Sequence, residues 1–151
     1  MKPATYWMQL ALELAEQAAG YDEVPVGAVV VLGGELIGKG FNQTISSHDP
    51  TAHAEVVALR DAAKQQNNYR LSGAELYVTI EPCTMCAGAL VHARISHLIF
   101  GAKEPRAGAI CSSSQVLDNP GLNHRVQVTS GICESEAGQL MADFFKAKRK
   151  S

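Results

Sequence analysis

The sequence reads His53-Ala54-Glu55 and, after an interval of 26 residues, Pro82-Cys83-Thr84-Met85-Cys86. One imidazole and two thiolates are ligands that Zn²⁺ accepts readily, and a site with three protein ligands keeps a fourth position open, as catalytic zinc sites do. A carboxylate two residues beyond the histidine is placed to move protons for whatever the metal activates. The two motifs therefore predict a catalytic zinc site, with the histidine and both cysteines as ligands and Glu55 beside them.

Helix starts explain how these spacings could bring the side chains together. Cys83 and Cys86 are three residues apart, so in a helix they share one face, and Pro82 suits the first turn of that helix. Thiols at the positive end of a helix dipole have a lowered pKa and favour the metal-binding form. For the histidine motif, Asp49-Pro50 followed by Thr51 as N-cap predicts a second helix start. We therefore expect two helix N-termini to point at one metal.

Two other interpretations of the cysteines are open from the sequence alone. A lone C-x-x-C is also found in thioredoxin-like redox proteins, although that motif needs no partner H-x-E. A structural zinc site would need a fourth protein ligand, and none of the possible donors has a second close-spaced ligand beside it. These possible donors are His48, His92, His97, His124, Cys111 and Cys133.

Composition limits the protein class. The chain has 151 residues, of which 46% are apolar and 19% charged, and we expect one globular domain spanning 1–151. No apolar run approaches the roughly 20 residues that span a membrane, and the first residues lead directly into an amphipathic segment, so neither a membrane span nor a signal peptide is expected. Four cysteines fit a reducing cytoplasm. With a net charge of −2, any contact with nucleic acid needs a local basic patch.

Hydrophobic periodicity predicts helices interleaved with strands. A β-branched run over 26–32, a Gly33-Gly34 pair and an alternating segment over 36–41 predict a hairpin with a tight glycine turn. Further strands are expected over 76–80, 97–100 and 125–129, and helices over about 7–18, 52–66, 87–94 and 134–150, with a loop-rich stretch over 102–124. This order predicts an α/β fold whose central sheet is mixed, has about five strands and is covered on both faces. Both motifs then lie where open α/β sheets bind ligands, at the strand-to-helix junctions.

Short segments across almost the whole chain match one family. They are Glu23–Val29, Asn42, Asp49–Glu55, Tyr69–Leu71, Leu76–Thr79, Glu81–Ala89, Phe100–Ala102, Asn123–Arg125 and Asp143–Phe145. The chain resembles the bacterial tRNA-specific adenosine deaminases of the cytidine-deaminase-like superfamily. The metal motifs specify the superfamily only. The contexts Pro-Thr-Ala-His-Ala-Glu, Asn-His-Arg and Phe-Phe point to the tRNA branch.

The resemblance implies a cytidine-deaminase-like three-layer α/β/α sandwich, one Zn²⁺ per subunit and a homodimer. It implies hydrolytic deamination of adenosine to inosine at the wobble position of a tRNA anticodon, with the anticodon stem-loop as partner. By position, the zinc ligands are His53, Cys83 and Cys86, and Glu55 carries the protons.

The resemblance also implies substrate contacts. Asn42 and the backbone of Ala54 match positions that contact the target nucleoside, while Phe144 and Phe145 match the terminal helix that meets the anticodon loop. Glu104 departs from the aspartate that is more common in the family, and its side chain is one methylene longer.

Each of these residues also has an ordinary structural interpretation. Asn42 could form a turn, one of the two phenylalanines could pack into the core, and the basic residues from Lys146 onward could be a solvated helix end. Three other functions are compatible with the motifs: deamination of another nucleobase or nucleoside such as cytosine, cytidine or guanine, a non-catalytic RNA-binding subunit, and a structural zinc module. The presence of Glu55 argues against the second.

Overall fold

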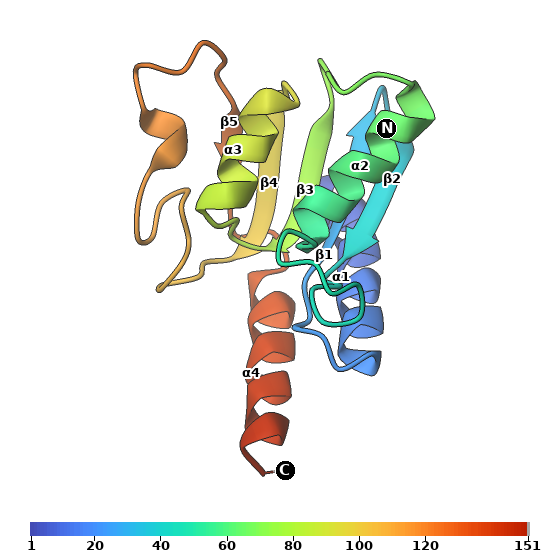
Figure 1. The fold of residues 1–151 in the computed structure, drawn as a ribbon, viewed down its shortest axis with the longest axis vertical. Coiled ribbons are helices and arrows are strands. Elements are labelled where there is room, and N and C mark those ends of the chain that lie inside the picture. Colours follow the sequence, from blue (N-terminus) through green and yellow to red (C-terminus); the bar gives the residue numbers. More distant parts are fainter. Residues whose placement is uncertain (151) are drawn as a thin grey trace.

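The computed structural model describes residues 1–150, and a five-stranded sheet forms its middle layer (Figure 1). The strand order is β2-β1-β3-β4-β5. β1 pairs antiparallel with β2 and β3, whereas β4 pairs parallel with β3 and β5, so the predicted mixed sheet is confirmed. The strands span Gly27–Leu32 (β1), Glu35–Phe41 (β2), Glu75–Ile80 (β3), His97–Ala102 (β4) and Gln127–Thr129 (β5).

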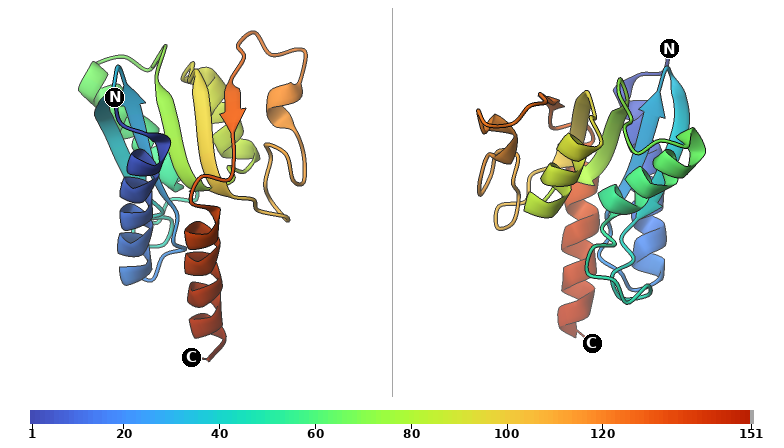
Figure 2. Two further views of the ribbon diagram at one scale, coloured as in Figure 1. Left: turned by 180° about the vertical axis from the view of Figure 1, so that it is seen from behind. Right: turned by 45° about the horizontal axis from the view of Figure 1, so that its top comes forward.

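Helices cover both faces of the sheet, which confirms the three-layer prediction (Figure 2). Helices α2 (Ala54–Gln66) and α3 (Thr84–His92) lie on one face, and α1 (Ala4–Gly20) lies on the other. The last helix, α4 (Glu134–Lys150), begins beside β4 on the α1 side and projects beyond the end of the sheet. Within the described residues, no helix has the length and apolar character needed to cross a membrane.

Strand β1 shows how the sequence produces two cores. Its residues are buried on both faces, so the run is almost continuously apolar instead of alternating. Val30 points into the larger cluster with α2 and α3, and its neighbours Val29 and Val31 point into the cluster with α1. The predicted hairpin turn is also confirmed, because Gly33 and Gly34 have φ of +60° and +79°, a pair of values typical of a type I′ turn.

The starts of α2 and α3 differ from the sequence prediction. Thr51 does not cap α2, because its hydroxyl donates to the Asp49 carboxylate at 2.7 Å; the N-cap is His53. Likewise, Pro82 lies before the first turn of α3, whose N-cap is Cys83. Both shifts move a predicted metal ligand onto the cap itself, where the backbone is extended and the side chain leans over the open end of the helix.

Candidate active site

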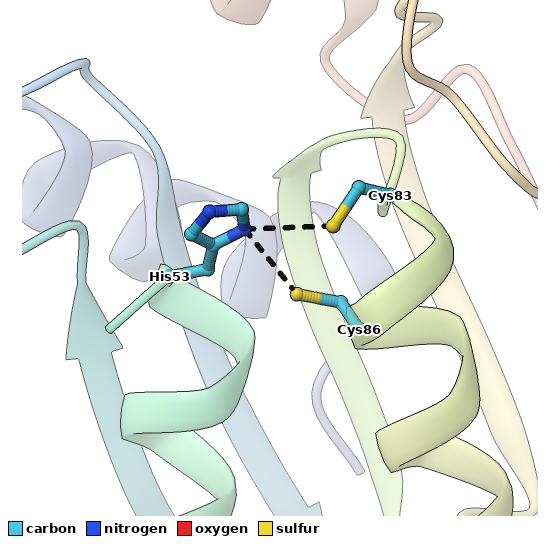
Figure 3. A group of neighbouring side chains, drawn as sticks. All are labelled: His53, Cys83 and Cys86. Atoms are coloured by element: carbon cyan, nitrogen blue, oxygen red, sulfur yellow. Dashed lines mark hydrogen bonds between the residues drawn. The ribbon is translucent and has the colours of Figure 1, made fainter. Parts of the chain in front are cut away.

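Three sulfur and nitrogen donors meet at two helix N-termini, as the sequence predicts (Figure 3). His53 precedes the first residue of α2, while Cys83 precedes α3 and Cys86 lies in the first turn of α3. The tight path from β3 into α3 brings both thiols to the end of the sheet where α2 begins. The two helix dipoles therefore place their positive ends at the same point.

The spacing of the three donor atoms fits a tetrahedral metal site. The His53 Nδ1 lies 3.5 Å from the Cys83 Sγ and 3.6 Å from the Cys86 Sγ, and all three atoms lie within 4.8 Å of one another. A tetrahedral Zn²⁺ with ordinary bond lengths separates a nitrogen from a sulfur ligand by about 3.6 Å. Among residues 1–150 the cluster has these three members, which does not favour a four-ligand structural site. The residues can thus hold a metal ion as three ligands.

Of the two thiols, Cys83 is polarised toward the metal-binding thiolate form, whereas Cys86 keeps its proton. Hydrogen bonds from Cys86 and His53 lower the pKa of the Cys83 thiol to about 3. The bond that Cys86 makes to Cys83, together with its burial, raises the pKa of the Cys86 thiol. The hydrogen bond to Cys83 raises the pKa of His53. Three groups that share protons in this way can release them to a cation, because a metal binds thiolate and neutral imidazole.

Glu55 occupies the second position of α2 and is only 4% exposed. Burial raises the pKa of this carboxyl group to about 7, and the negative charge on Cys83 acts in the same direction. A carboxyl group whose pKa lies near neutrality can both accept and return a proton at physiological pH. The structure therefore places a group suited to general acid–base chemistry beside the metal ligands.

These residues open into a pocket of 160 Å³. Its lining includes the candidate metal ligands His53 and Cys83, the carboxyl group of Glu55, and residues from other segments, among them Asn42, Glu104 and Met141. The Asn42 side-chain oxygen accepts the backbone N–H of Ala54 at 2.9 Å, so the two predicted nucleoside contacts are bonded to each other. That bond also fixes the first residue of α2 against the end of β2.

The two phenylalanines of α4 lie outside this pocket. Phe144 faces α1 and lines a cavity of 620 Å³ with Asp22 and Lys148. Phe145 is 41% exposed and lines a neighbouring cavity of 310 Å³. That cavity shares Glu104 and Met141 with the pocket of 160 Å³. The two rings meet edge to face with their centroids 5.3 Å apart, but they line different cavities, and only Phe145 reaches the side of α4 on which the pocket opens.

Sequence reasoning missed two further buried carboxylates, Glu23 and Glu81, which are 1% and 4% exposed. Glu23 accepts the backbone N–H groups of Ile45 and Ser46, at 3.2 and 2.6 Å, in the loop that follows Asn42. Glu81 holds a second loop, after β4. The sequence signal for Glu81 was its position, since it directly follows the apolar strand β3, where an unpaired charge is costly.

Comparisons with known proteins identify the family of this chain. The model of the MafB19-like deaminase family matches residues 3–149. A tRNA-specific adenosine deaminase of Haemophilus influenzae is 49% identical over 144 residues, which are 95% of this chain and 83% of the relative. A solved structure from a study of A-to-I editing by tRNA:A34 deaminases at the wobble position has a TM-score of 0.88 and 46% identity, covering 90% of this chain and 99% of that one.

A more distant structure shares the fold alone. The guanine deaminase from Nitrosomonas europaea has a TM-score of 0.82 at 24% identity, covering 95% of this chain and 85% of that one. The tRNA-specific relatives are about twice as similar to this chain in sequence as the guanine deaminase is, which assigns the chain to the tRNA-specific branch. The chain belongs to the MafB19-like deaminase family and, within it, to the tRNA-specific adenosine deaminases.

Proposed function

We propose that this protein converts adenosine to inosine at the wobble position of a tRNA anticodon, by hydrolytic deamination. The observation that carries the proposal is the meeting of a three-donor metal cluster with the buried Glu55 carboxylate in one pocket. The names of the relatives support adenosine in tRNA as the substrate class. Enzymes that act on a base must take it out of its stack, which costs less in a loop than in a duplex.

The cluster suits Zn²⁺ as its metal, held by His53, Cys83 and Cys86. Bound there, the ion supplies a water molecule acidified from its bulk pKa toward neutrality. Glu55 would carry two protons in turn: the first, from the attacking water, goes to the ring nitrogen, and the second, from the hydroxyl group that the water has added to the ring, goes to the amine, which leaves as ammonia. We propose that the Asn42 side chain and the Ala54 backbone, which are hydrogen-bonded to each other at the start of α2, contact the nucleoside.

One Zn²⁺ per chain and a homodimer complete the proposal, with the cytoplasm as the compartment in which tRNA is found. Elemental analysis of purified protein should give one zinc per chain, and removal of the metal with a chelator should abolish turnover until zinc is restored. Light scattering should give twice the mass of 16.1 kDa. Full activity without metal would contradict the zinc site, and a monomeric mass would contradict the dimer.

The test of function uses an anticodon stem-loop that carries adenosine at the wobble position. Incubation with the zinc-loaded protein should produce inosine, measured by digestion to nucleosides and mass spectrometry. A stem-loop with the adenosine moved to a paired position, together with free adenosine, cytidine and guanine, serves as control and should remain unchanged. Deamination of a free base or nucleoside without action on the stem-loop would assign the protein to another substrate class. A protein inactive on every substrate would favour the non-catalytic subunit.

A further inference from the structure

Glu81 is a buried carboxylate whose hydrogen-bond donors all come from one loop. Its Oε2 accepts the backbone N–H groups of Ile110, Cys111 and Ser112 at 3.1, 2.8 and 3.0 Å. Its Oε1 accepts the backbone N–H of Glu104 at 3.1 Å and the hydroxyl of Ser112. The two oxygens thus hold both ends of the segment 104–112, which we call the wall loop.

No cation offsets this charge, since Glu81 takes part in none of the ion pairs found within residues 1–150. Burial of this carboxylate is offset instead by the donors of one loop, which are the backbone N–H groups of Glu104, Ile110, Cys111 and Ser112 and the Ser112 hydroxyl. Because only loop donors satisfy this buried carboxylate, moving the loop away would leave the charge without hydrogen bonds, which is costly. The carboxylate therefore holds the loop in place.

The wall loop is also fitted closely around the carboxylate. At Gly108, an added Cβ would lie 2.5 Å from the Glu81 Oε1 and 2.4 Å from the Glu104 carbonyl oxygen, so no side chain fits there. The next residue, Ala109, donates its N–H to the carbonyl oxygen of Pro82 at 2.8 Å. The loop is therefore docked on the β3–α3 junction, immediately before the first thiol ligand.

Two residues of the wall loop, Glu104 and Ala107, line the pocket together with Glu81 itself. The Glu81 Oε1 holds Glu104 through its N–H, and the Glu104 carboxylate in turn accepts the N–H of Ala107. We propose that Glu81 is a positioning residue, whose carboxylate fixes the wall loop so that Glu104 and Ala107 shape the pocket beside the metal cluster. The expected changes in kinetic constants rest on the proposed deaminase function. The expected change in the mobility of the wall loop does not depend on that function.

The proposal predicts which kinetic constant changes. The wall loop borders the pocket but supplies neither a metal ligand nor the proton carrier. Loosening it should remove binding that ground state and transition state share, which raises KM and leaves kcat nearly unchanged. A role in stability alone would differ, since it would reduce the fraction of folded enzyme and hence the apparent kcat, without changing KM.

Glu81→Gln tests the proposal because glutamine keeps the length of the side chain but has one acceptor oxygen. With that oxygen facing the three N–H groups of residues 110–112, the amide N–H₂ faces the N–H of Glu104, and that bond is lost. For the zinc-loaded variant acting on the stem-loop we expect KM to rise roughly tenfold, with kcat within about threefold of the parent. Hydrogen exchange, measured by mass spectrometry, should quicken at residues 104–108, with zinc content unchanged.

Matched variants separate the loop contact from general effects. Ser112→Ala removes only the hydroxyl donor and keeps the backbone bonds, so its KM should rise less than that of Glu81→Gln. Glu13→Gln, on the exposed side of α1, makes the same chemical change and should behave as the parent. Gly108→Ala displaces the loop by adding a methyl group on the loop's own side, and it should also raise KM. It therefore keeps the proposal testable if Glu81→Gln fails to fold. Gly20→Ala, where an added Cβ meets nothing within 4 Å, is its control.

An unchanged KM in folded Glu81→Gln and Gly108→Ala would overturn the proposal, and so would a fall confined to kcat. Hydrogen exchange tests whether Glu81 positions the wall loop even if the protein shows no activity. If the parent protein produces no inosine, the proposed function fails, but faster exchange confined to the wall loop in Glu81→Gln still supports the positioning role. Exchange identical to that of the parent would reject it.

Discussion

At the scale of single residues, Glu55 carries the most specific expectation. Its carboxylate is buried at the start of α2 and shares a pocket with His53 and Cys83. Glu55→Gln keeps the shape of the side chain and removes its capacity to carry a proton. General acid–base groups contribute typically 10²- to 10⁴-fold, so turnover should fall by at least about 10²-fold. Single-turnover inosine formation measures this loss.

Zinc content must accompany that measurement, because Glu55 is not among the three donors of the cluster. The variant should bind as much zinc as the parent. Glu35→Gln, an exposed carboxylate at the start of β2, is the matched control and should retain full turnover. Near-normal turnover in Glu55→Gln would show that another group moves the proton.

Glu23 makes a prediction about acid stability. Burial alone would raise the pKa of this carboxyl group, but the hydroxyl and N–H donors of Ser46 and the N–H of Ile45 outweigh burial and lower it from its ordinary value of 4.5. A group with a lowered folded-state pKa stabilises the protein above its unfolded pKa and loses that contribution as pH falls through the folded one. Stability from Glu23 is therefore present at pH 5 and above and declines below about pH 4.5.

Thermal melts of the parent protein and Glu23→Gln check this sign. The variant should melt at a lower Tm at pH 7, and the difference in Tm should narrow on going from pH 5 to pH 3. A Tm difference that stays constant over this range would mean that Glu23 titrates alike in the folded and unfolded states. Glu13→Gln, exposed on α1, should match the parent at every pH.

At the scale of elements, the sequence predicted what depends on nearby residues. Apolar periodicity located all five strands and the four main helices, and the glycine pair located the turn. Helix starts were less predictable. Thr51 and His53 both precede α2, and the hydrogen bond from Thr51 to Asp49 decides which of them caps it. The role of Glu81 depends on loop donors 23 to 31 residues further along the chain, which no local pattern reveals.

The close packing of β2 against α2 is another feature that no local sequence pattern reveals, and it can be tested. An added Cβ at Gly38 would lie 2.6 Å from the carbonyl oxygen of Ala58 and 2.7 Å from the Cβ of Ala62, both on α2. Because the nearest atoms include backbone, they cannot rotate away. Gly38→Ala should therefore lower the free energy of unfolding by about 1–3 kcal/mol, the usual cost of overpacking.

Denaturant unfolding at a fixed zinc concentration measures this change. Gly138→Ala is the matched control, because an added Cβ there meets nothing within 4 Å in the interior of α4. Alanine has the higher helix propensity, so the control should be as stable as the parent or up to about 1 kcal/mol more stable. Equal stability of Gly38→Ala and the parent would mean that α2 can move away from β2 without loss.

At the scale of the whole molecule, separate segments converge on one end of the sheet. The pocket takes residues from the end of β2, the starts of α2 and α3, the wall loop after β4, and α4. Parallel strands β3 and β4 direct their carboxyl ends to this edge, where open α/β sheets bind ligands. Helix α4 begins beside it and continues past the body of the protein (Figure 1), so its far end extends the surface around the pocket.

That far end is where a nucleic-acid surface is expected. The chain has a net charge of −2, so attraction to RNA must be local. Lys146, Arg149 and Lys150 are exposed on α4, in the same helix as the exposed ring of Phe145. Basic groups bind phosphates and an aromatic ring stacks on an unpaired base, which together suit an anticodon loop. Lys148 differs, since its ammonium group pairs with Asp22 at 2.5 Å and holds α4 against α1.

Removing residues from Lys146 onward should weaken binding to the stem-loop and reduce its dependence on salt, since each lost phosphate contact lowers the slope of log affinity against log salt by about 0.7–0.9. The truncation also removes the Lys148–Asp22 ion pair, so the matched variant changes Lys146, Arg149 and Lys150 to alanine and keeps the helix. Both proteins should retain their zinc, and titrations of fluorescent stem-loop at several salt concentrations measure the slopes. If the triple variant keeps the affinity and slope of the parent, the RNA surface lies elsewhere. A weakened slope in both places the phosphate contacts on the end of α4.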